Sequence, residues 1–158
     1  MKGFGDLYKE KKKKTQKDKS SREQIIKQAI QFHSEGNISE ASKYYEYCLK
    51  QRFNDHRVFS NYGVILKDIG QFKEAEIFLR KAIELNPDYA IAYSNLAGIL
   101  INLSRLAEAE IFLRKAIELN PDTAISYSNL GGILRDQGKL KEAETSLRKA
   151  IELNPSYA

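Results

Sequence analysis

A period of 34 residues constrains this chain more than any other feature of its sequence. The string LRKAIELNP occurs three times, beginning at Leu79, Leu113 and Leu147. The string YSNL begins at Tyr93 and again at Tyr127, at the same spacing. Similarity at a fixed period of this length is typical of repeat proteins, in which each unit packs only against its neighbours. The period therefore predicts a stack of similar units.

Asn-Pro pairs close these strings and set the boundaries of the units. Aligning Pro87, Pro121 and Pro155 gives repeats at 56–89, 90–123 and 124–157, and a more divergent copy fits 22–55. We predict a repeat array over residues 21–157, preceded by a basic polar leader over residues 1–20. Ser20 and Glu23 form a capping-box pattern, which predicts that the first helix of the array begins there.

Each repeat has the apolar pattern of two helices. In 90–123, a first run follows the i, i+3, i+4, i+7 spacing of one buried helical face, and a second run begins at Leu106. The break between the runs is Gly70 or Gly138 in the neighbouring repeats, but Ser104 here. We expect a positive φ at this break, which would cost Ser104 up to about 1 kcal/mol relative to glycine.

The period, the paired helices and the order aromatic, Leu-Gly, Ala, Ala, Pro resemble the tetratricopeptide repeat (TPR) family. Phe59, Tyr93 and Tyr127 stand where the family often has tryptophan. The resemblance covers most of the chain. It implies an all-α fold, a right-handed superhelical solenoid of four helix-turn-helix TPR units. It also implies that the first helix of each unit lines a concave groove, where family members bind proteins or extended peptides.

The resemblance places three sets of residues in that groove. The sixth position is asparagine in the repeats 56–89, 90–123 and 124–157. An asparagine amide offers a donor and an acceptor, so it can match the C=O and N–H of an extended peptide whatever its side chains. This arrangement resembles the Asn ladder in the TPR arm of O-linked N-acetylglucosamine transferases. The alternative is that these asparagines stabilise packing between first helices. The predicted peptide-binding residues are Asn61, Asn95 and Asn129, with Ser60, Ser94 and Ser128 at the fifth position and Lys67, Asn102 and Arg135 further along.

One kind of peptide is not expected to bind. Chaperone-binding TPR domains resemble one another in a carboxylate clamp of lysine, arginine and asparagine side chains. The corresponding positions here hold Ile26 and Ile30, or Ser60 and Val64, and the later basic members are absent. We therefore expect no binding of an acidic EEVD-type C-terminus.

No set of residues in the sequence suggests catalysis or a cofactor. The two histidines and the single Cys48 lack the spacing of a metal site, and we expect Cys48 to be a small core residue. Phosphate-binding glycine loops and nucleophile-elbow motifs do not occur. Glutamates followed four residues later by arginine, such as Glu76 and Arg80, are typical of ion pairs on a solvated helix. We expect a protein that is not an enzyme and binds neither metal nor cofactor.

Charge is concentrated at the N-terminus. Residues 1–24 contain nine Lys/Arg and four Asp/Glu, a balance of 9 − 4 = +5, which is the whole formal charge of the chain. The balanced array gives no electrostatic reason to bind nucleic acid. The basic segment is either a solvated leader, a charged extension of the first helix, or a contact with anionic lipid or nucleic acid. With a single cysteine and no apolar run of about 18 residues, we expect a cytoplasmic protein with no membrane span.

The C-terminal end of the array leaves alternatives open. The chain stops at Ala158 with no polar capping helix, so Leu147 and Ile151 should be partly bare. Either the chain is a fragment of a longer array, or these residues mediate self-association. The sequence also resembles the leading section of bacterial multi-repeat proteins in which a TPR array precedes a transferase domain. The predicted function is thus a protein- or peptide-binding scaffold, with a substrate-recruiting segment of a larger transferase or a self-assembling array as alternatives.

Overall fold

The structure, a computed structural model, describes residues 4–157, with their side chains from residue 18 onward. This part of the chain forms eight α-helices and a short 3-10 helix (Pro155–Tyr157), and contains no strand. The helices divide into two compact units, residues 1–54 and residues 55–158. The fold is an all-α helical-repeat solenoid, as the sequence predicts.

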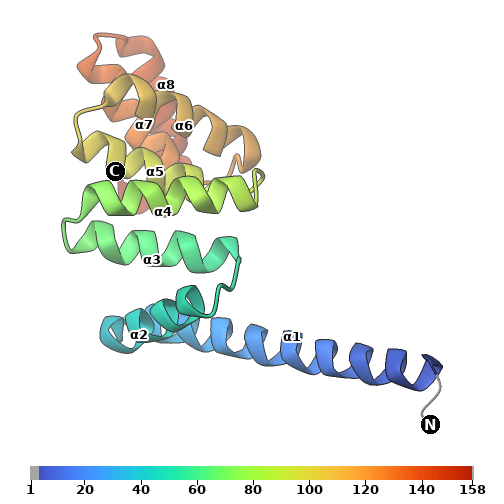
Figure 1. The fold of residues 1–158 in the computed structure, drawn as a ribbon. Helices are drawn as coiled ribbons and strands as arrows, with labels where there is room; N and C mark the ends of the chain where they lie inside the picture. The colour runs from blue at the N-terminus through green and yellow to red at the C-terminus, as the bar shows by residue number, and fades with distance from the viewer. Residues whose placement is uncertain (1–3, 158) are drawn as a thin grey trace. The chain divides into compact units, whose positions relative to one another are not determined.

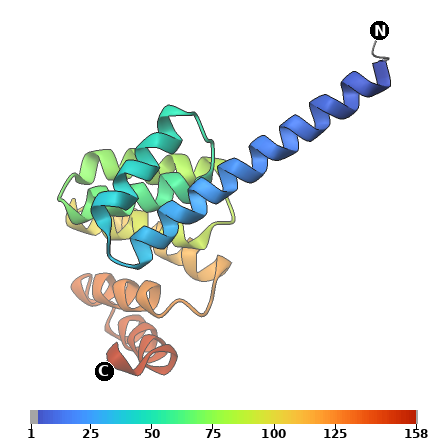
Figure 2. The same ribbon diagram turned by 90° about the horizontal axis from the view of Figure 1, so that it is seen from below.

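Unit 1 is one pair of helices, α1 (Phe4–Ser34) and α2 (Ile38–Lys50). The α1 helix is continuous across residue 20, so the capping pattern of Ser20 and Glu23 does not begin a helix, and that prediction is wrong. Figure 2 shows the first half of α1 running on beyond the part that packs against α2. Most of the predicted leader is thus a helical extension, while residues 1–3 lie outside the described residues. The division of the sequence at residue 20 remains a prediction.

The end of α2 differs from the ends of the later second helices, because Phe53 stands where they have proline. Arg52 adopts a φ of 55°. The Phe53 N–H donates to the Cys48 carbonyl and the Arg52 N–H to the Leu49 carbonyl, each at 2.9 Å. This pair of bonds is a Schellman motif, which ends a helix through one left-handed residue. The divergent repeat thus stops its second helix by a different device.

Unit 2 contains three successive pairs of helices (Figure 1). Helices within a pair and between successive pairs make extensive contacts. The second helix of each pair ends one residue before an Asn-Pro step, and Asn86, Asn120 and Asn154 are extended there, as a residue before proline prefers. The pairs are α3 (His56–Asp68) with α4 (Phe72–Leu85), α5 (Ala90–Asn102) with α6 (Leu106–Leu119), and α7 (Ala124–Asp136) with α8 (Leu140–Leu153).

The turn inside each pair depends on one left-handed residue. Gly70 and Gly138 have φ values of 79° and 76°, and Ser104 has a φ of 58°, as expected from its place in the repeat. At Ser104 the Arg105 N–H donates to the Leu100 carbonyl at 2.8 Å, which again completes a Schellman motif. All three turns therefore have the same form, although only Ser104 carries the steric cost of a side chain at positive φ.

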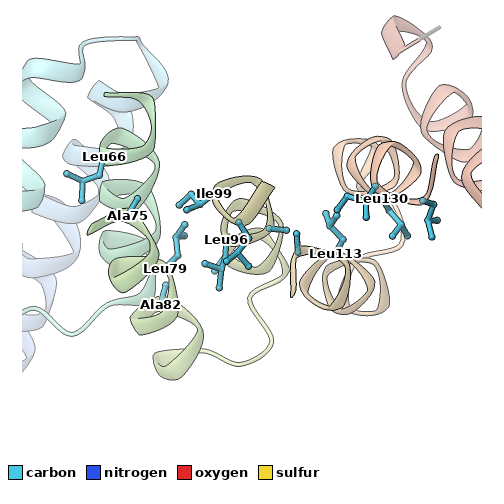
Figure 3. Close-up of a cluster of buried hydrophobic side chains, with 14 of the residues drawn as sticks. Leu66, Ala75, Leu79, Ala82, Leu96, Ile99, Leu113 and Leu130 are labelled. Atoms are coloured by element: carbon cyan, nitrogen blue, oxygen red, sulfur yellow. The ribbon is translucent and has the colours of Figure 1, made fainter. Parts of the chain in front are cut away.

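The core of unit 2 runs along the stack as one apolar cluster, in which Leu79, Leu96 and Leu113 are fully buried (Figure 3). Within a pair the helices approach closely at small residues. A Cβ added to Gly63 would lie 3.0 Å from Leu79 Cγ, and one added to Gly131 would lie 2.6 Å from Leu147 Cγ. Packing requires glycine at these two positions. The side of each first helix that carries the glycine faces its partner helix, and the opposite side is its outer face.

Candidate functional site

One outer face of the first helices in unit 2 carries the predicted asparagines, and we call it the first-helix face. On α5 its members follow the spacing i, i+4, i+7, i+11, which keeps them on one side of a helix. Ile91 and Ile125 are 52% and 50% exposed, and all three asparagines are partly exposed. The first-helix face comprises Arg57, Asn61, Val64 and Asp68 on α3, Ile91, Asn95, Gly98 and Asn102 on α5, and Ile125, Asn129, Gly132 and Asp136 on α7.

The side-chain amides of Asn61, Asn95 and Asn129 make no hydrogen bond within the described part of the chain. Each amide offers two N–H donors and a carbonyl acceptor. Asn102 differs, because its Nδ2 donates to the Gly98 carbonyl at 2.9 Å. The three asparagines at the sixth position therefore leave their hydrogen-bonding capacity unused inside the fold, and no hydrogen bond between first helices involves them.

Gly98 and Gly132 lie one turn beyond these asparagines and leave the surface open. A Cβ added to either glycine would meet nothing within 4 Å. Glycine in a helix costs about 1 kcal/mol relative to alanine, and here no close packing requires it. At these two positions another chain can approach the helix backbone.

The fifth-position serines do not share one environment. Ser60 and Ser94 are 0% and 8% exposed, whereas Ser128 is partly exposed. The Ser126 hydroxyl donates to Ser94 Oγ at 3.0 Å and links α7 to α5, while Ser60 Oγ has no partner in the described structure. Ser60 and Ser94 thus pack between helices and present no surface for a ligand, which differs from the expectation. The burial of these two serines depends on the contacts between successive first helices.

The cations of this region are paired with aspartates on their own helix. Lys67 Nζ lies 3.2 Å from an oxygen of Asp68, and Arg135 Nη2 lies 3.2 Å from an oxygen of Asp136. Lys67 and Arg135 are both partly or fully exposed, at the far end of the face from Ile125. Each positive charge is thus accompanied by a negative one, so the face has no concentrated charge for an acidic ligand.

The charge at the N-terminus of α3 is balanced in the same way. Asp55 caps the helix, accepting from the Arg57 N–H at 2.9 Å and from the Arg57 guanidinium at 2.9 and 2.8 Å. Burial favours the neutral acid, but these hydrogen bonds outweigh it and hold the pKa of the Asp55 carboxyl below its usual value. Both groups remain charged near neutral pH, as a pair.

The outer faces of the second helices carry ion pairs instead of unpartnered groups. Glu76 accepts from Arg80, one turn later on α4, at 2.9 Å and from Arg105 of the next repeat at 2.7 Å. Glu108 accepts in turn from Arg80 and Arg105. The hydrogen bond from Arg80 is the main reason that the pKa of Glu108 lies below its usual value, and partial burial opposes this shift. These charges are used to join neighbouring repeats.

Comparison with known protein families identifies the repeats. Two tetratricopeptide repeat models match the chain, one over residues 56–89 and the other over residues 88–156. Together they span all of the helices of unit 2. The chain belongs to the tetratricopeptide repeat family. Among curated proteins, none matches the chain by sequence.

Solved TPR structures share this fold. The crystal structure of MamA is 21% identical, with a TM-score of 0.74, and the match covers 99% of this chain and 97% of that one. YrrB, described as a TPR protein with an unusual peptide-binding site, is 25% identical with a TM-score of 0.69, covering 87% and 71%. The first TPR of Spaghetti (RPAP3), bound to the HSP90 peptide SRMEEVD, is 26% identical with a TM-score of 0.62, covering 64% and 80%.

Two hollows lie at equivalent positions of two TPR units, and none of the three asparagines lines either hollow. In unit 1 a hollow of about 390 Å³ is lined by Ile25, Tyr44 and Tyr47, with Glu40 and Lys43. In unit 2 a hollow of about 500 Å³ is lined by apolar Phe59, Ile77 and Phe78, with Arg80, Lys81 and Glu84. Counted within the repeat, Ile25 corresponds to Phe59 and Tyr44 to Phe78. The two hollows thus lie on the same edge of two different repeats, one in unit 1 and one in unit 2.

The residues predicted for self-association lie on α8. Leu79 and Leu113 are fully buried, while Leu147, at the same repeat position, is partly exposed and Ile151 is 37% exposed. Leu147 also contacts Gly131 within its own TPR unit, so it has a structural role as well. Both side chains are thus partly exposed, and a change at Ile151 tests this surface more cleanly than one at Leu147.

Other classes of site receive no support from the described residues. No three of their histidine, cysteine, aspartate and glutamate side chains are grouped so as to hold a metal ion. None of the described helices combines the length and the apolar content needed to cross a bilayer. The predicted list of binding residues left out Ile91 and Ile125, although an apolar residue four positions before Asn95 and before Asn129 is a signal for them.

Proposed function

We propose that the first-helix face of unit 2 binds an extended segment of a partner protein, and that the chain is a binding scaffold rather than a catalyst. Asn61, Asn95 and Asn129 hold the segment by hydrogen bonds to its backbone. The observation that carries this proposal is that three amides at one repeat position make no hydrogen bond within the described structure. Within the described residues, no hydrogen bond between first helices involves them.

The dimensions of a repeat fit an extended chain. Neighbouring helices pack about 8–10 Å apart, and an extended chain rises about 3.3 Å per residue. One asparagine per repeat then meets roughly every third residue of the peptide. Gly98 and Gly132 leave room for the peptide backbone, since a Cβ there would meet nothing within 4 Å. Ile91 on α5 and Ile125 on α7 belong to the same first-helix face and supply apolar contacts for side chains of the ligand.

Related TPR structures support a peptide ligand but not the same peptide. YrrB and the Spaghetti TPR are described with a peptide-binding site and a bound peptide. The Spaghetti ligand ends in acidic residues. Here Arg57, Lys67 and Arg135 each pair with an aspartate one or two residues away. The proposed ligand of this chain is therefore an internal, extended segment without a concentration of negative charge.

The test begins with a ligand selected from random peptides displayed on phage, using the full chain as bait. Fluorescence anisotropy then gives the affinity of a selected peptide for the wild type and for the triple variant Asn61→Ala, Asn95→Ala, Asn129→Ala. The matched control changes three residues at one position of the second helices, as Ile77→Ala, Ile111→Ala, Thr145→Ala. These side chains are exposed, and Ile77 and Ile111 are both 68% exposed.

We expect the asparagine variant to weaken binding by about tenfold to a thousandfold, because each lost hydrogen bond contributes about 0.5–1.5 kcal/mol. The control should bind as the wild type does. Circular dichroism confirms that both variants remain helical. An unchanged affinity in the asparagine variant, together with a loss in the control, would place the ligand on the second helices and refute the proposal.

A second candidate function is self-association through α8. It is favoured by the exposure of Ile151 and by the contrast between Leu147 and its buried counterparts. We expect Ile151→Glu to lower the weight-average mass measured by light scattering at high protein concentration. An equal loss of mass with the control Ile77→Glu would show that the effect is not specific to α8.

A further inference from the structure

The contacts between successive TPR units of unit 2 follow one pattern. In the first such interface, Arg80 of α4 forms an ion pair with Glu108 of α6. The Arg80 guanidinium also lies over the ring of Phe112, 5.4 Å from its centroid. A cation over an aromatic face is a favourable electrostatic contact in addition to the ion pair. One arginine of the earlier unit thus meets a glutamate and an aromatic ring of the next.

The second interface repeats the ion pair at the same repeat positions. Arg114 of α6 lies 3.2 Å from Glu142 of α8. A crossing pair accompanies it, with Lys139 Nζ 3.7 Å from Glu110. Ser146 stands at the position of Phe112, so here the aromatic ring is absent. The arginine–glutamate pair is therefore the constant feature of the interface between units.

The α8 helix presents the donor side of this interface once more. Arg148 occupies the repeat position of Arg80 and Arg114, and Glu144 that of Glu76 and Glu110. Their side chains are 78% and 62% exposed, and within the described residues they pair with each other. With Ile151 beside them, they form what we call the α8 edge. The residues at the repeat positions of Arg148 and Glu144 in the earlier second helices form ion pairs with the following unit.

Unit 1 presents the receiving side. Glu40 occupies the repeat position of Glu108, and Tyr44 that of Phe112. Both residues line the hollow of about 390 Å³, together with Ile25, Lys43 and Tyr47. Lys43 Nζ pairs with Glu40 at 2.6 Å, and the hydrogen bond that Lys43 donates to Glu40 raises the pKa of Lys43. This surface, the unit 1 edge, combines an aromatic hollow with a glutamate at the place where an arginine would dock.

We infer that the α8 edge of one copy docks on the unit 1 edge of a second copy. Arg148 pairs with Glu40 and lies over the ring of Tyr44, as Arg80 does with Glu108 and Phe112. Ile151 enters the apolar hollow, and Glu144 meets Lys43. Asn37 replaces the basic residue found at the position of Arg105 and Lys139, so Lys43 takes over that charge. The inference rests on the proposed self-association and adds the surface that receives α8.

Two different surfaces meet in this contact, so the assembly is head-to-tail. A heterologous contact of this kind leaves one donor edge and one receiving edge free in every oligomer and allows further copies to add, unless a ring closes. The weight-average mass should therefore rise past that of a dimer as concentration increases. A symmetric pairing of two α8 edges would stop at the dimer.

Sedimentation velocity of the full chain over a range of concentrations tests both steps. We expect association beyond the dimer that weakens with added salt. Arg148→Glu should weaken it by about tenfold or more, since close interfacial charge pairs are strongly coupled. Ile151→Glu should have a similar effect, because it would place a charge in the apolar hollow. A chain that stays monomeric at all concentrations overturns the self-association and this inference together. A plateau at the dimer overturns only the head-to-tail contact.

Charge exchange identifies the receiving surface. The double variant Arg148→Glu, Glu40→Arg should recover association close to the wild-type level, because the pair is restored with its signs reversed. Glu74→Arg is the matched control, since Glu74 has the same repeat position as Glu40 but lies on α4 of unit 2. Rescue of Arg148→Glu by Glu74→Arg and not by Glu40→Arg would place the contact on unit 2 and refute the inference. Circular dichroism confirms the helicity of every variant.

Discussion

The two outer faces of unit 2 are built on the same period but use their polar groups differently. On the second helices, Glu76 and Glu108 are bound by Arg80 and Arg105, within one repeat and across two. On the first helices, Asn95 and its counterparts make no hydrogen bond within the described residues. The ion-paired groups on the second helices stabilise the stack. The asparagine amides on the first helices have no such role in hydrogen bonding, and this is the basis of the proposed peptide binding.

Glycine shows the same contrast within a single helix. Gly131 packs against Leu147, and Gly63 against Leu79, whereas Gly98 and Gly132 face open space. The inward glycines allow two helices to approach closely. The outward ones contribute nothing to packing and weaken the helix by about 1 kcal/mol each. The packed and the open sides of the first helices thus differ in their glycines as well as in their polar groups.

The largest expected effect on stability comes from the inward side. Gly63→Val should lower the free energy of unfolding by about 1–3 kcal/mol, because an added side chain would press on Leu79 and on the Ala75 carbonyl, 3.0 and 3.3 Å from the new Cβ. Leu79 is fully buried and has no space to move into. Urea unfolding checks this value, and an unchanged midpoint would show that the pair of helices separates readily.

The outward glycines should respond in the opposite direction. Gly98→Ala and Gly132→Ala should each raise the free energy of unfolding by up to about 1 kcal/mol, through helix propensity alone. If peptide backbone approaches here, the same variants should bind a selected peptide more weakly. Unfolding and anisotropy measured on one preparation separate the two effects. A variant that gains stability and keeps full affinity would remove these glycines from the binding site.

Part of this contrast could be predicted from the sequence. The turn residues, including Ser104 with its positive φ, follow from the 34-residue alignment, and so do the Glu-Arg pairs one turn apart. The burial of Ser60 and Ser94 does not, since it depends on contacts between successive first helices. The Ser94–Ser126 hydrogen bond is one such contact, between α5 and α7. Periodicity assigns a residue to a helix face, but packing between repeats decides how much of that face is exposed.

The cross-repeat ion pairs were missed, and the start of the first helix was wrongly placed at Ser20, for a related reason. Arg105 and Glu76 are far apart in the sequence, and their contact depends on the offset between stacked units. At the N-terminus, the capping-box pattern at Ser20 is a local signal, whereas α1 continues through it from Phe4. A capping residue begins a helix only where the chain before it leaves the helical conformation.

Removing one ion-pair acceptor from the second helices should lower the free energy of unfolding by less than the Gly63→Val change does. Glu76→Gln should lower the free energy of unfolding by about 0.5–1 kcal/mol, because Glu76 holds two arginines but all three groups are partly solvated. Asn95→Ala, the matched change on the other face, should leave stability unchanged or slightly raised. Thermal unfolding of the two variants compares the faces directly. A larger loss with Asn95→Ala would mean that the ladder stabilises packing.

The smallest expected effect is on the pH dependence of stability. Hydrogen bonds from Gln137 and then from Arg114 outweigh partial burial and hold the pKa of Glu110 below its usual value. A depressed folded-state pKa contributes stability above the unfolded pKa of about 4.3, and this is lost as pH falls through the folded value. Glu110→Gln should therefore reduce the acid-induced loss by a few tenths of a kcal/mol. Identical pH profiles from urea unfolding would contradict this.

The central claim is that the unpartnered asparagines hold a peptide. Nitrogen-15 NMR observes side-chain amides directly, and single Asn→Ala variants assign the signals of Asn61, Asn95 and Asn129. Titration with a selected peptide should shift these three signals, while the amide of Asn120, in the loop after α6, stays in place. Shifts confined to residues of the second helices, with the three asparagine signals unmoved at saturation, would contradict the account.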